Sequence, residues 1–179
     1  FNFAAEVNRG LSCAFENANV EYGLILNSDT IVGPYWLSNM LEVLASKGNE
    51  GVGLVGPVSN AAIREQTILR GDAVFEAPLR LSGFCMMMKR KVFTDLDGFD
   101  ESFVGGGFED WDFCTRAKKA GWKMAIDART HVHHFHRVTR LGVDHDKSMA
   151  ENRDRFFTKW PDLKQHRAVM TTTNGNTPN

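Results

Sequence analysis

Short apolar runs alternate with longer segments of helical period along this sequence, and that alternation restricts the possible folds more than any other feature. The runs have the length of buried strands, and the longer segments repeat an apolar side chain every three or four residues, as a helix with one buried face does. Residues 59–78 show no sustained period and are interpreted as a loop region with at most a short helix. Candidate strands are 22–26, 51–55, 81–88, 123–126 and 130–138, and candidate helices are 4–18, 34–44, 89–96, 109–120 and 146–160. Strands alternating with helices predict an α/β sandwich with a mixed central sheet.

The composition fits one core. A chain of 179 residues, 42% of them hydrophobic, can bury a single domain core, so we predict a domain over 1–165 and a polar, disordered tail over 166–179. A net charge of −1 gives no protein-wide field for nucleic acid, and no apolar run approaches the length of a membrane span. The isolated cysteines Cys13, Cys85 and Cys114 fit a reducing compartment. We therefore expect a cytoplasmic protein, or one peripheral to the cytoplasmic face of a membrane.

An acidic segment after three glycines is the strongest candidate for chemistry. Gly105–Gly107 allow positive φ and close approach of a ligand to the backbone, and Glu109, Asp110 and Asp112 then open a predicted helix. Carboxylates in a first helical turn also complement the helix dipole, so a capped helix after a turn is the structural alternative. Neighbouring acids do not share a helix face, so at most one points at a substrate while the other caps or orients. A carboxylate that accepts a proton from a nucleophile typically contributes about 10²–10⁴ in rate.

Polar residues also follow the first predicted strand. Asn27, Ser28 and Asp29 come directly after 22–26, and ligands bind at the carboxyl ends of strands in open α/β sheets. Asp29 alone is weak evidence, because an aspartate before a threonine also caps turns and helices.

Four histidines lie within six residues, at positions 131, 133, 134 and 136. In a strand, alternate side chains share a face, so His134 and His136 would face one way and His131 and His133 the other. Such a cluster would suit zinc in a structural domain, but the cysteines lack the spacing of a zinc finger. One imidazole together with carboxylates and phosphate oxygens would instead suit Mn²⁺ or Mg²⁺.

Taken together, these motifs resemble the inverting family 2 glycosyltransferases, which have the GT-A fold. The resemblance covers the chain to about Leu163, and Asn27 stands where the family's aspartate-x-aspartate segment has its first aspartate, which leaves that site one negative charge fewer. The matching segments are Asn8-Arg9-Gly10, Leu24–Thr30, Leu81–Cys85, Gly98–Phe103, Glu109–Arg116, Gly121-Trp122 and Asn152–Trp160.

The resemblance implies a role for each candidate residue. Asp29 and His134 would bind Mn²⁺ or Mg²⁺, with His133 and His136 as alternatives to His134. Asp110 would be the catalytic base that deprotonates the acceptor hydroxyl, and Glu109 would be a second catalytic residue that orients acceptor or sugar. Substrate-binding residues would be Asn27, Ser28, Gly83, Gly106, Gly107 and Asp112.

The resemblance also sets expectations for the whole protein. The family's first strand-helix units, which hold the nucleotide base, are absent from this sequence. We therefore expect an N-terminally truncated GT-A-like domain, inactive alone unless a partner supplies that pocket. Expected partners are a nucleotide-sugar donor, a carbohydrate or other hydroxyl acceptor and a second copy of the chain, with no nucleic acid. The alternative function is a non-catalytic remnant that acts as a binding or interaction module.

Overall fold

A computed structural model describes residues 2–68, 71–135 and 145–166. The helices are α1 (Phe3–Glu16), α2 (Trp36–Ala45), α3 (Arg64–Ile68), α4 (Arg90–Asp95), α5 (Glu109–Lys119) and α6 (His145–Lys159), followed by a 3₁₀ helix, η1 (Pro161–His166). The strands are β1 (Tyr22–Leu26), β2 (Thr30–Val32), β3 (Val52–Val58), β4 (Val74–Glu76), β5 (Cys85–Lys89) and β6 (Lys123–His134).

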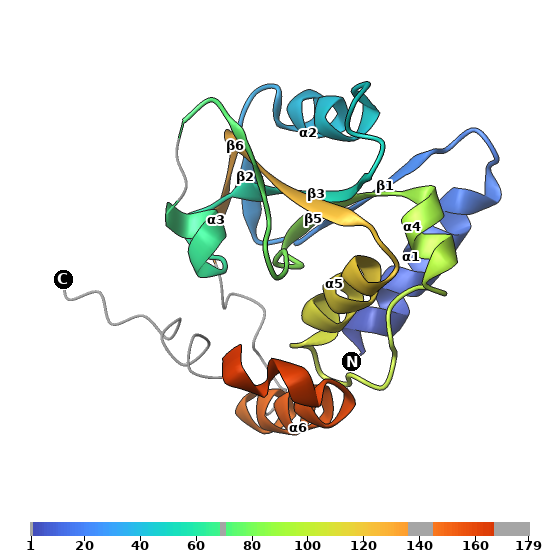
Figure 1. Cartoon of the computed structure of the whole chain (residues 1–179), viewed down its shortest axis with the longest axis vertical. Helices are drawn as coiled ribbons and strands as arrows, with labels where there is room; N and C mark the ends of the chain where they lie inside the picture. The colour runs from blue at the N-terminus through green and yellow to red at the C-terminus, as the bar shows by residue number, and fades with distance from the viewer. Residues whose placement is uncertain (1, 69–70, 136–144, 167–179) are drawn as a thin grey trace.

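The strands form one mixed sheet in the order β1-β5-β3-β6-β2, and β4 also pairs with β6. The β3–β6 pair is parallel, whereas the other pairs are antiparallel. Helix α2 covers one face of the sheet, α1, α4 and α5 cover the other, and α6 lies beyond α5 (Figure 1). The predicted α/β sandwich with a mixed sheet is therefore confirmed.

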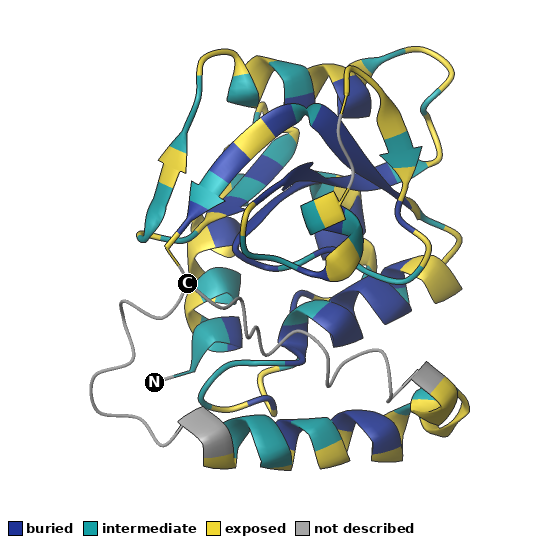
Figure 2. Cartoon of the chain, turned by 90° about the vertical axis from the view of Figure 1, so that its left-hand side faces the viewer, coloured by how far each residue is buried: buried dark blue, intermediate teal, exposed yellow. Residues whose placement is uncertain are grey.

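The central strands supply the core on both faces of the sheet, which Figure 2 shows as buried ribbon between the helices. Successive residues of β5 point to opposite faces, so Met86 and Met88 join the apolar cluster under α1, α4 and α5, while Cys85 and Met87 join the cluster under α2. Each of these four side chains is at most 3% exposed. The three consecutive methionines Met86–Met88 are therefore core packing.

An aromatic cluster fixes α6 against α5. Trp111 of α5 stacks on Phe156 of α6 with ring centroids 4.4 Å apart, and Phe103, Phe108 and Phe157 complete the buried cluster. Fully burying one such side chain contributes on the order of 1.5–3 kcal/mol, so α6 is an integral part of this domain.

Three details of the sheet differ from the prediction. The strands predicted at 123–126 and 130–138 form one strand as far as His134, and residues 136–138 lie outside the described part of the chain. The pairing of β6 with β3 shifts between Asp127 and His131, and that irregularity interrupts the alternation of the sequence. Strands β2 and β4 were not predicted, because three residues are too few to show a period.

Cys13, Cys85 and Cys114 are all free thiols. Burial raises the pKa of Cys85 and of Cys114 to about 12, so neither is a nucleophile at neutral pH. Among the residues that the structure describes, no helix has the length and apolar character needed to cross a membrane. Residues 167–179, which make up nearly all of the predicted tail, lie outside that part of the chain.

Candidate active site

Asp29 and His134 meet where β2 pairs with β6. The antiparallel register sets Thr30 opposite His134, and the amide of Phe135 donates a 3.0 Å hydrogen bond to the carbonyl oxygen of Asp29. The carboxylate Oδ1 of Asp29 then lies 3.3 Å from Nε2 of His134, and both side chains are less than a tenth exposed. The sheet itself therefore brings together the two residues predicted to bind a metal.

The imidazole of His134 is held on several sides. Its Nδ1 lies 3.0 Å from the carbonyl oxygen of Ala61. A carbonyl oxygen can only accept a hydrogen bond, so Nδ1 carries the proton when Nε2 binds a cation. The ring of Phe84 stacks on the imidazole with centroids 4.8 Å apart and an interplanar angle of 12°. This arrangement directs Nε2, the atom that would coordinate a cation, toward Asp29.

The pair fits a divalent cation that also binds a phosphate group. Ligands on adjacent corners of an octahedral ion lie roughly 3 Å apart, close to the separation of Asp29 Oδ1 and His134 Nε2. No group of three or more histidine, cysteine or acidic side chains that could hold a metal occurs within the described ranges. Water and substrate oxygens can supply the further ligands, as in many Mg²⁺ sites that hold phosphates.

Of the two histidines predicted as alternatives to His134 in the metal site, the structure describes only His133. His133 lies on the opposite face of β6 from His134, and its ring makes an edge contact with Phe135, with centroids 4.7 Å apart. His136 lies outside the described residues.

Asp110 is anchored at the start of α5. Its Oδ2 accepts a 2.9 Å hydrogen bond from the amide of Gly83, and its Oδ1 accepts a 2.7 Å bond from the amide of Trp111. Arg80 lies over the ring of Trp111, with its guanidinium 3.9 Å from the carboxylate of Asp110. A Cβ atom at Gly83 would lie 3.2 Å from the Cβ of Asp110, so a side chain at position 83 would press on this carboxylate. The side chain of Asp110 is 15% exposed, which leaves it reachable by a substrate.

Glu109 differs from its neighbour in environment. The residue is only 7% exposed, and its Oε2 has no hydrogen-bond partner among the described residues. Burial, and next the negative charge of Asp110, raise the pKa of Glu109 to about 8, although the amides of Glu109 and Gly107 and the charge of Arg80 act in the other direction. Glu109 is therefore mostly protonated at pH 7 and can donate a hydrogen bond.

The glycine loop before α5 has the backbone that only glycines adopt readily. Gly105, Gly106 and Gly107 have φ values of 79°, 85° and 96°. Asn152 of α6 donates hydrogen bonds of 3.0 and 3.2 Å to the carbonyl oxygens of Val104 and Gly106. The space beside Gly106 is open, whereas a Cβ atom at Gly107 would overlap Met149 of α6. Of the two glycines predicted to bind substrate, Gly106 therefore has open space on the side where a Cβ atom would lie, and Gly107 has Met149 there.

Asp112 belongs to the contact between α5 and the end of α6. It is fully buried, and its Oδ2 accepts a 2.8 Å bond from Arg116. Its Oδ1 accepts a 2.8 Å bond from the indole N–H of Trp160 and lies 2.8 Å from the ammonium of Lys159. Because both oxygens are engaged within the protein, Asp112 holds α5 to the end of α6, and its predicted contact with substrate stays a prediction.

The dipeptide Gly83-Phe84 connects the two halves of the site. The amide of Gly83 binds Asp110, while the ring of Phe84 stacks on His134. The carbonyl oxygen of Phe84 also accepts a 2.8 Å bond from the amide of Asn27, at the end of β1, and Ser28 beyond it is exposed. Two consecutive residues thus join the predicted base to the predicted metal ligands. Arg80 and Ala61 were not singled out from the sequence, because an isolated basic or alanine residue carries no pattern. Phe84 entered only as part of the matching segment Leu81–Cys85 and was given no role.

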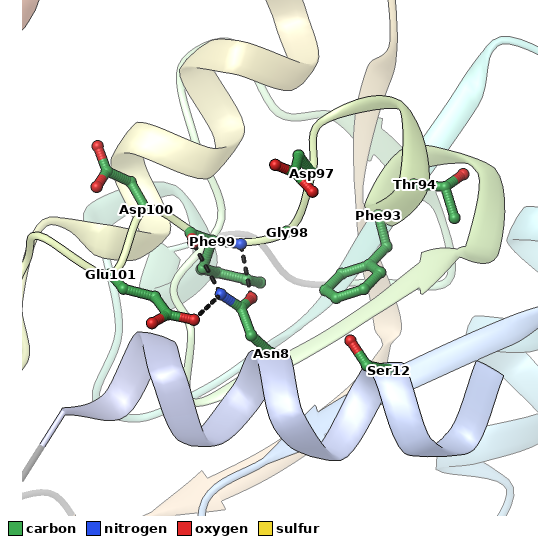
Figure 3. Close-up of a pocket in the computed structure, with 9 residues that line it drawn as sticks. All are labelled: Asn8, Ser12, Phe93, Thr94, Asp97, Gly98, Phe99, Asp100 and Glu101. Atoms are coloured by element: carbon green, nitrogen blue, oxygen red, sulfur yellow. Dashed lines mark hydrogen bonds between the residues drawn. The ribbon is translucent and has the colours of Figure 1, made fainter. Parts of the chain in front are cut away.

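A separate pocket of about 640 Å³ lies between α1 and the 97–101 segment. Figure 3 shows Asn8 of α1 bonded to this segment. Its amide oxygen accepts from the amide of Phe99, and its amide nitrogen donates to the carbonyl oxygen of Phe99 and to the carboxylate of Glu101. Asn8 therefore fixes the segment that precedes α5. None of the predicted site residues lines this pocket.

The chain is similar to known glycosyltransferases. Residues 74–141 match the family described as the N-terminal domain of galactosyltransferase. Among solved structures, GalNAc-T7 with UDP, GalNAc and Mn²⁺ aligns with a TM-score of 0.59 and 12% identity over 94% of this chain and 41% of the other. The catalytic domain of Drosophila β1,4-galactosyltransferase 7 with xylobiose aligns with a TM-score of 0.52 and 17% identity over 82% of this chain and 59% of the other.

No curated protein matches the sequence. The chain spans 41% and 59% of the two solved chains. It has the fold of the GT-A-type glycosyltransferases, as predicted from its motifs, and is short relative to these neighbours.

Proposed function

We propose that this chain is part of an inverting glycosyltransferase that moves a sugar from a nucleoside-diphosphate sugar to an acceptor hydroxyl, as the family 2 enzymes that its motifs resemble do. The observation that carries the proposal is the connection through Gly83-Phe84, which links Asp110 to the pair of Asp29 and His134. A base and a cation site joined in this way are what the transfer of a sugar from a diphosphate requires.

Asp29 and His134 would hold Mn²⁺ or Mg²⁺. When bound, the ion offsets the negative charge of the departing diphosphate. Mn²⁺ and UDP are bound by the neighbour GalNAc-T7, which supports testing UDP and UDP-sugars first.

Asp110 would act as the general base. As the acceptor oxygen forms its bond to the anomeric carbon, the bond from that carbon to the diphosphate breaks, and the hydroxyl proton passes to Asp110. The two backbone amides that hold its oxygens fix its direction before the substrate arrives, so little reorganisation accompanies the transfer. Attack from the side opposite the diphosphate inverts the anomeric configuration.

Glu109 would orient the acceptor or the sugar. Because it is mostly protonated at neutral pH, it offers a hydrogen-bond donor where Asp110 offers an acceptor. Two adjacent acids in different protonation states can thus take different roles. Gly106, with open space beside it, would let a sugar approach the backbone.

The experiment that tests this proposal measures release of nucleoside diphosphate from a panel of UDP-sugars with Mn²⁺ and with hydroxyl acceptors such as xylosides. Asp110→Asn should reduce turnover by about 10²–10⁴ and leave the affinity for UDP unchanged, because only the base is lost. Asp154→Asn makes the same chemical change on the exposed face of α6 and is the matched control.

If Asp110→Asn retains the turnover of the unaltered chain, the assignment of the base is wrong. If the chain binds a sugar or a protein but no nucleoside diphosphate, with or without Mn²⁺, the non-catalytic binding module that the sequence left as the alternative is favoured instead.

A further inference from the structure

The side chain of Asn60 takes the place of a strand next to His134. Strand β3 pairs with β6 only as far as Val58, which lies opposite His131. Beyond that point the side-chain oxygen of Asn60 accepts a 2.8 Å bond from the amide of His134, and its side-chain nitrogen donates a 3.0 Å bond to the carbonyl oxygen of His134. A carboxamide offers the same donor and acceptor as a peptide group, so Asn60 extends the ladder by one residue.

The residue after Asn60 then reaches the imidazole. The carbonyl oxygen of Ala61 lies 3.0 Å from Nδ1 of His134, and the amide of Ala61 is held by a 3.2 Å bond to the hydroxyl of Ser59. The backbone and the ring of His134 are therefore both bonded to residues 60 and 61. A shift of this turn would withdraw the acceptor that keeps the proton on Nδ1.

We propose that Asn60 is a positioning residue which, through the Ala61 carbonyl, fixes the imidazole of His134 with its proton on Nδ1 and with Nε2 directed at Asp29. That His134 binds a metal rests on the function proposed above. That Asn60 orients the imidazole rests only on the three hydrogen bonds between residues 60–61 and His134. Groups that orient a ligating histidine typically change metal affinity by about 10–100-fold when they are removed.

The test uses the 179-residue chain and the variant Asn60→Ala. Asn60 is an exposed residue, so its truncation opens no cavity in the core. Asn49→Ala is the matched control, because Asn49 likewise bonds a backbone carbonyl, that of Val43, from a turn elsewhere in the chain. Should Asn60→Ala fail to fold, the isosteric Asn60→Asp replaces it, since a carboxylate cannot donate to the carbonyl oxygen of His134.

Two readouts are taken. The first is the ¹⁵N spectrum of the His134 ring without metal, at a pH where the imidazole is neutral, with His134→Gln to assign the signals. The chain and Asn49→Ala should keep the proton on Nδ1, and Asn60→Ala should shift it toward Nε2, which faces the carboxylate of Asp29. The second is Mn²⁺ affinity, followed by the loss of the free-ion signal in electron paramagnetic resonance, which should fall about 10-fold or more in Asn60→Ala only.

The outcomes distinguish the positioning role of Asn60 from the proposed metal site. If the chain carries the proton on Nε2, or if Asn60→Ala changes neither the ring spectrum nor the Mn²⁺ affinity, the positioning role is overturned. If the ring spectrum changes as expected but the unaltered chain binds no Mn²⁺, Asn60 does position the imidazole and the proposed metal site fails.

Discussion

Replacing Glu109 with glutamine should make the protein more stable at neutral pH, although the residue lies in the candidate active site. The folded state raises the pKa of this carboxyl from 4.5 to about 8, because the side chain is buried and lies beside the charge of Asp110. Between these two values the unfolded chain releases the proton while the folded chain keeps it. The free energy of unfolding therefore falls as pH rises through this window, and it is fully retained only below pH 4.5.

The magnitude follows from the size of the shift. Each pH unit inside the window removes up to about 1.4 kcal/mol, so the contribution lost between pH 4.5 and pH 7 is about 3 kcal/mol. Glutamine has nearly the shape of the protonated acid and does not ionise. The variant should thus match the unaltered chain near pH 4.5 and exceed it by about 3 kcal/mol at pH 7.

Urea unfolding at pH 5, 6, 7 and 8 measures this difference. The quantity of interest is the gap in free energy of unfolding between Glu109→Gln and the unaltered chain at each pH. A comparison within one pH cancels the titration of every other group. Asp110→Asn supplies the control: without the charge of Asp110 the pKa of Glu109 falls, and the gap narrows. A gap that stays constant from pH 5 to pH 8 would refute the assignment of Glu109 as a protonated acid. Active sites often contain residues that lower stability in favour of function, so a stabilising substitution such as Glu109→Gln is expected at one.

Four further substitutions test the geometry. Gly106→Ala, whose Cβ atom would enter open space, should cost about 1–2 kcal/mol in urea unfolding because of its positive φ. Gly107→Ala carries the same backbone penalty and would also displace the thioether of Met149, so it should cost more; a smaller loss at Gly107 than at Gly106 would contradict the packing of α6 on this loop. Asp112→Asn should cost about 3 kcal/mol by weakening buried bonds between α5 and α6, and a loss below 0.5 kcal/mol would contradict it. Gly83→Ala should lower turnover at least about 10-fold, since it displaces the carboxylate that the position 83 amide holds; unchanged turnover would contradict the anchoring of the base.

The long helices and strands could be predicted because the apolar repeat of each lies within its own segment of the sequence. Helices α1, α2 and α5 and strand β1 lie close to their predicted positions, since each repeats its buried side within a few residues. The short strands β2 and β4 could not be predicted, because their pairing with β6 depends on residues far away in the sequence.

In the candidate site, too, features set by neighbouring residues could be predicted, and features set by distant residues could not. The face of β6 that carries His134 followed from strand alternation, and the structure buries Val132 and His134 while it exposes His131 and Phe135. The position of Asp112 did not follow, because its partner Trp160 lies a whole strand and helix away. Carboxylates in one helical turn look alike in sequence, and only the packing of the folded chain separates the buried Glu109 and Asp112 from the reachable Asp110.

The most direct test of the proposed function is calorimetric titration of UDP into this chain with and without Mn²⁺, repeated with GDP and with the variants Asp29→Asn and His134→Gln. The account predicts that UDP binds only when Mn²⁺ is present, and that either substitution weakens this binding at least about 10-fold. The absence of any Mn²⁺-dependent binding of either nucleotide, or binding that both variants retain in full, would contradict the assignment of Asp29 and His134 as a cation site for a nucleoside diphosphate.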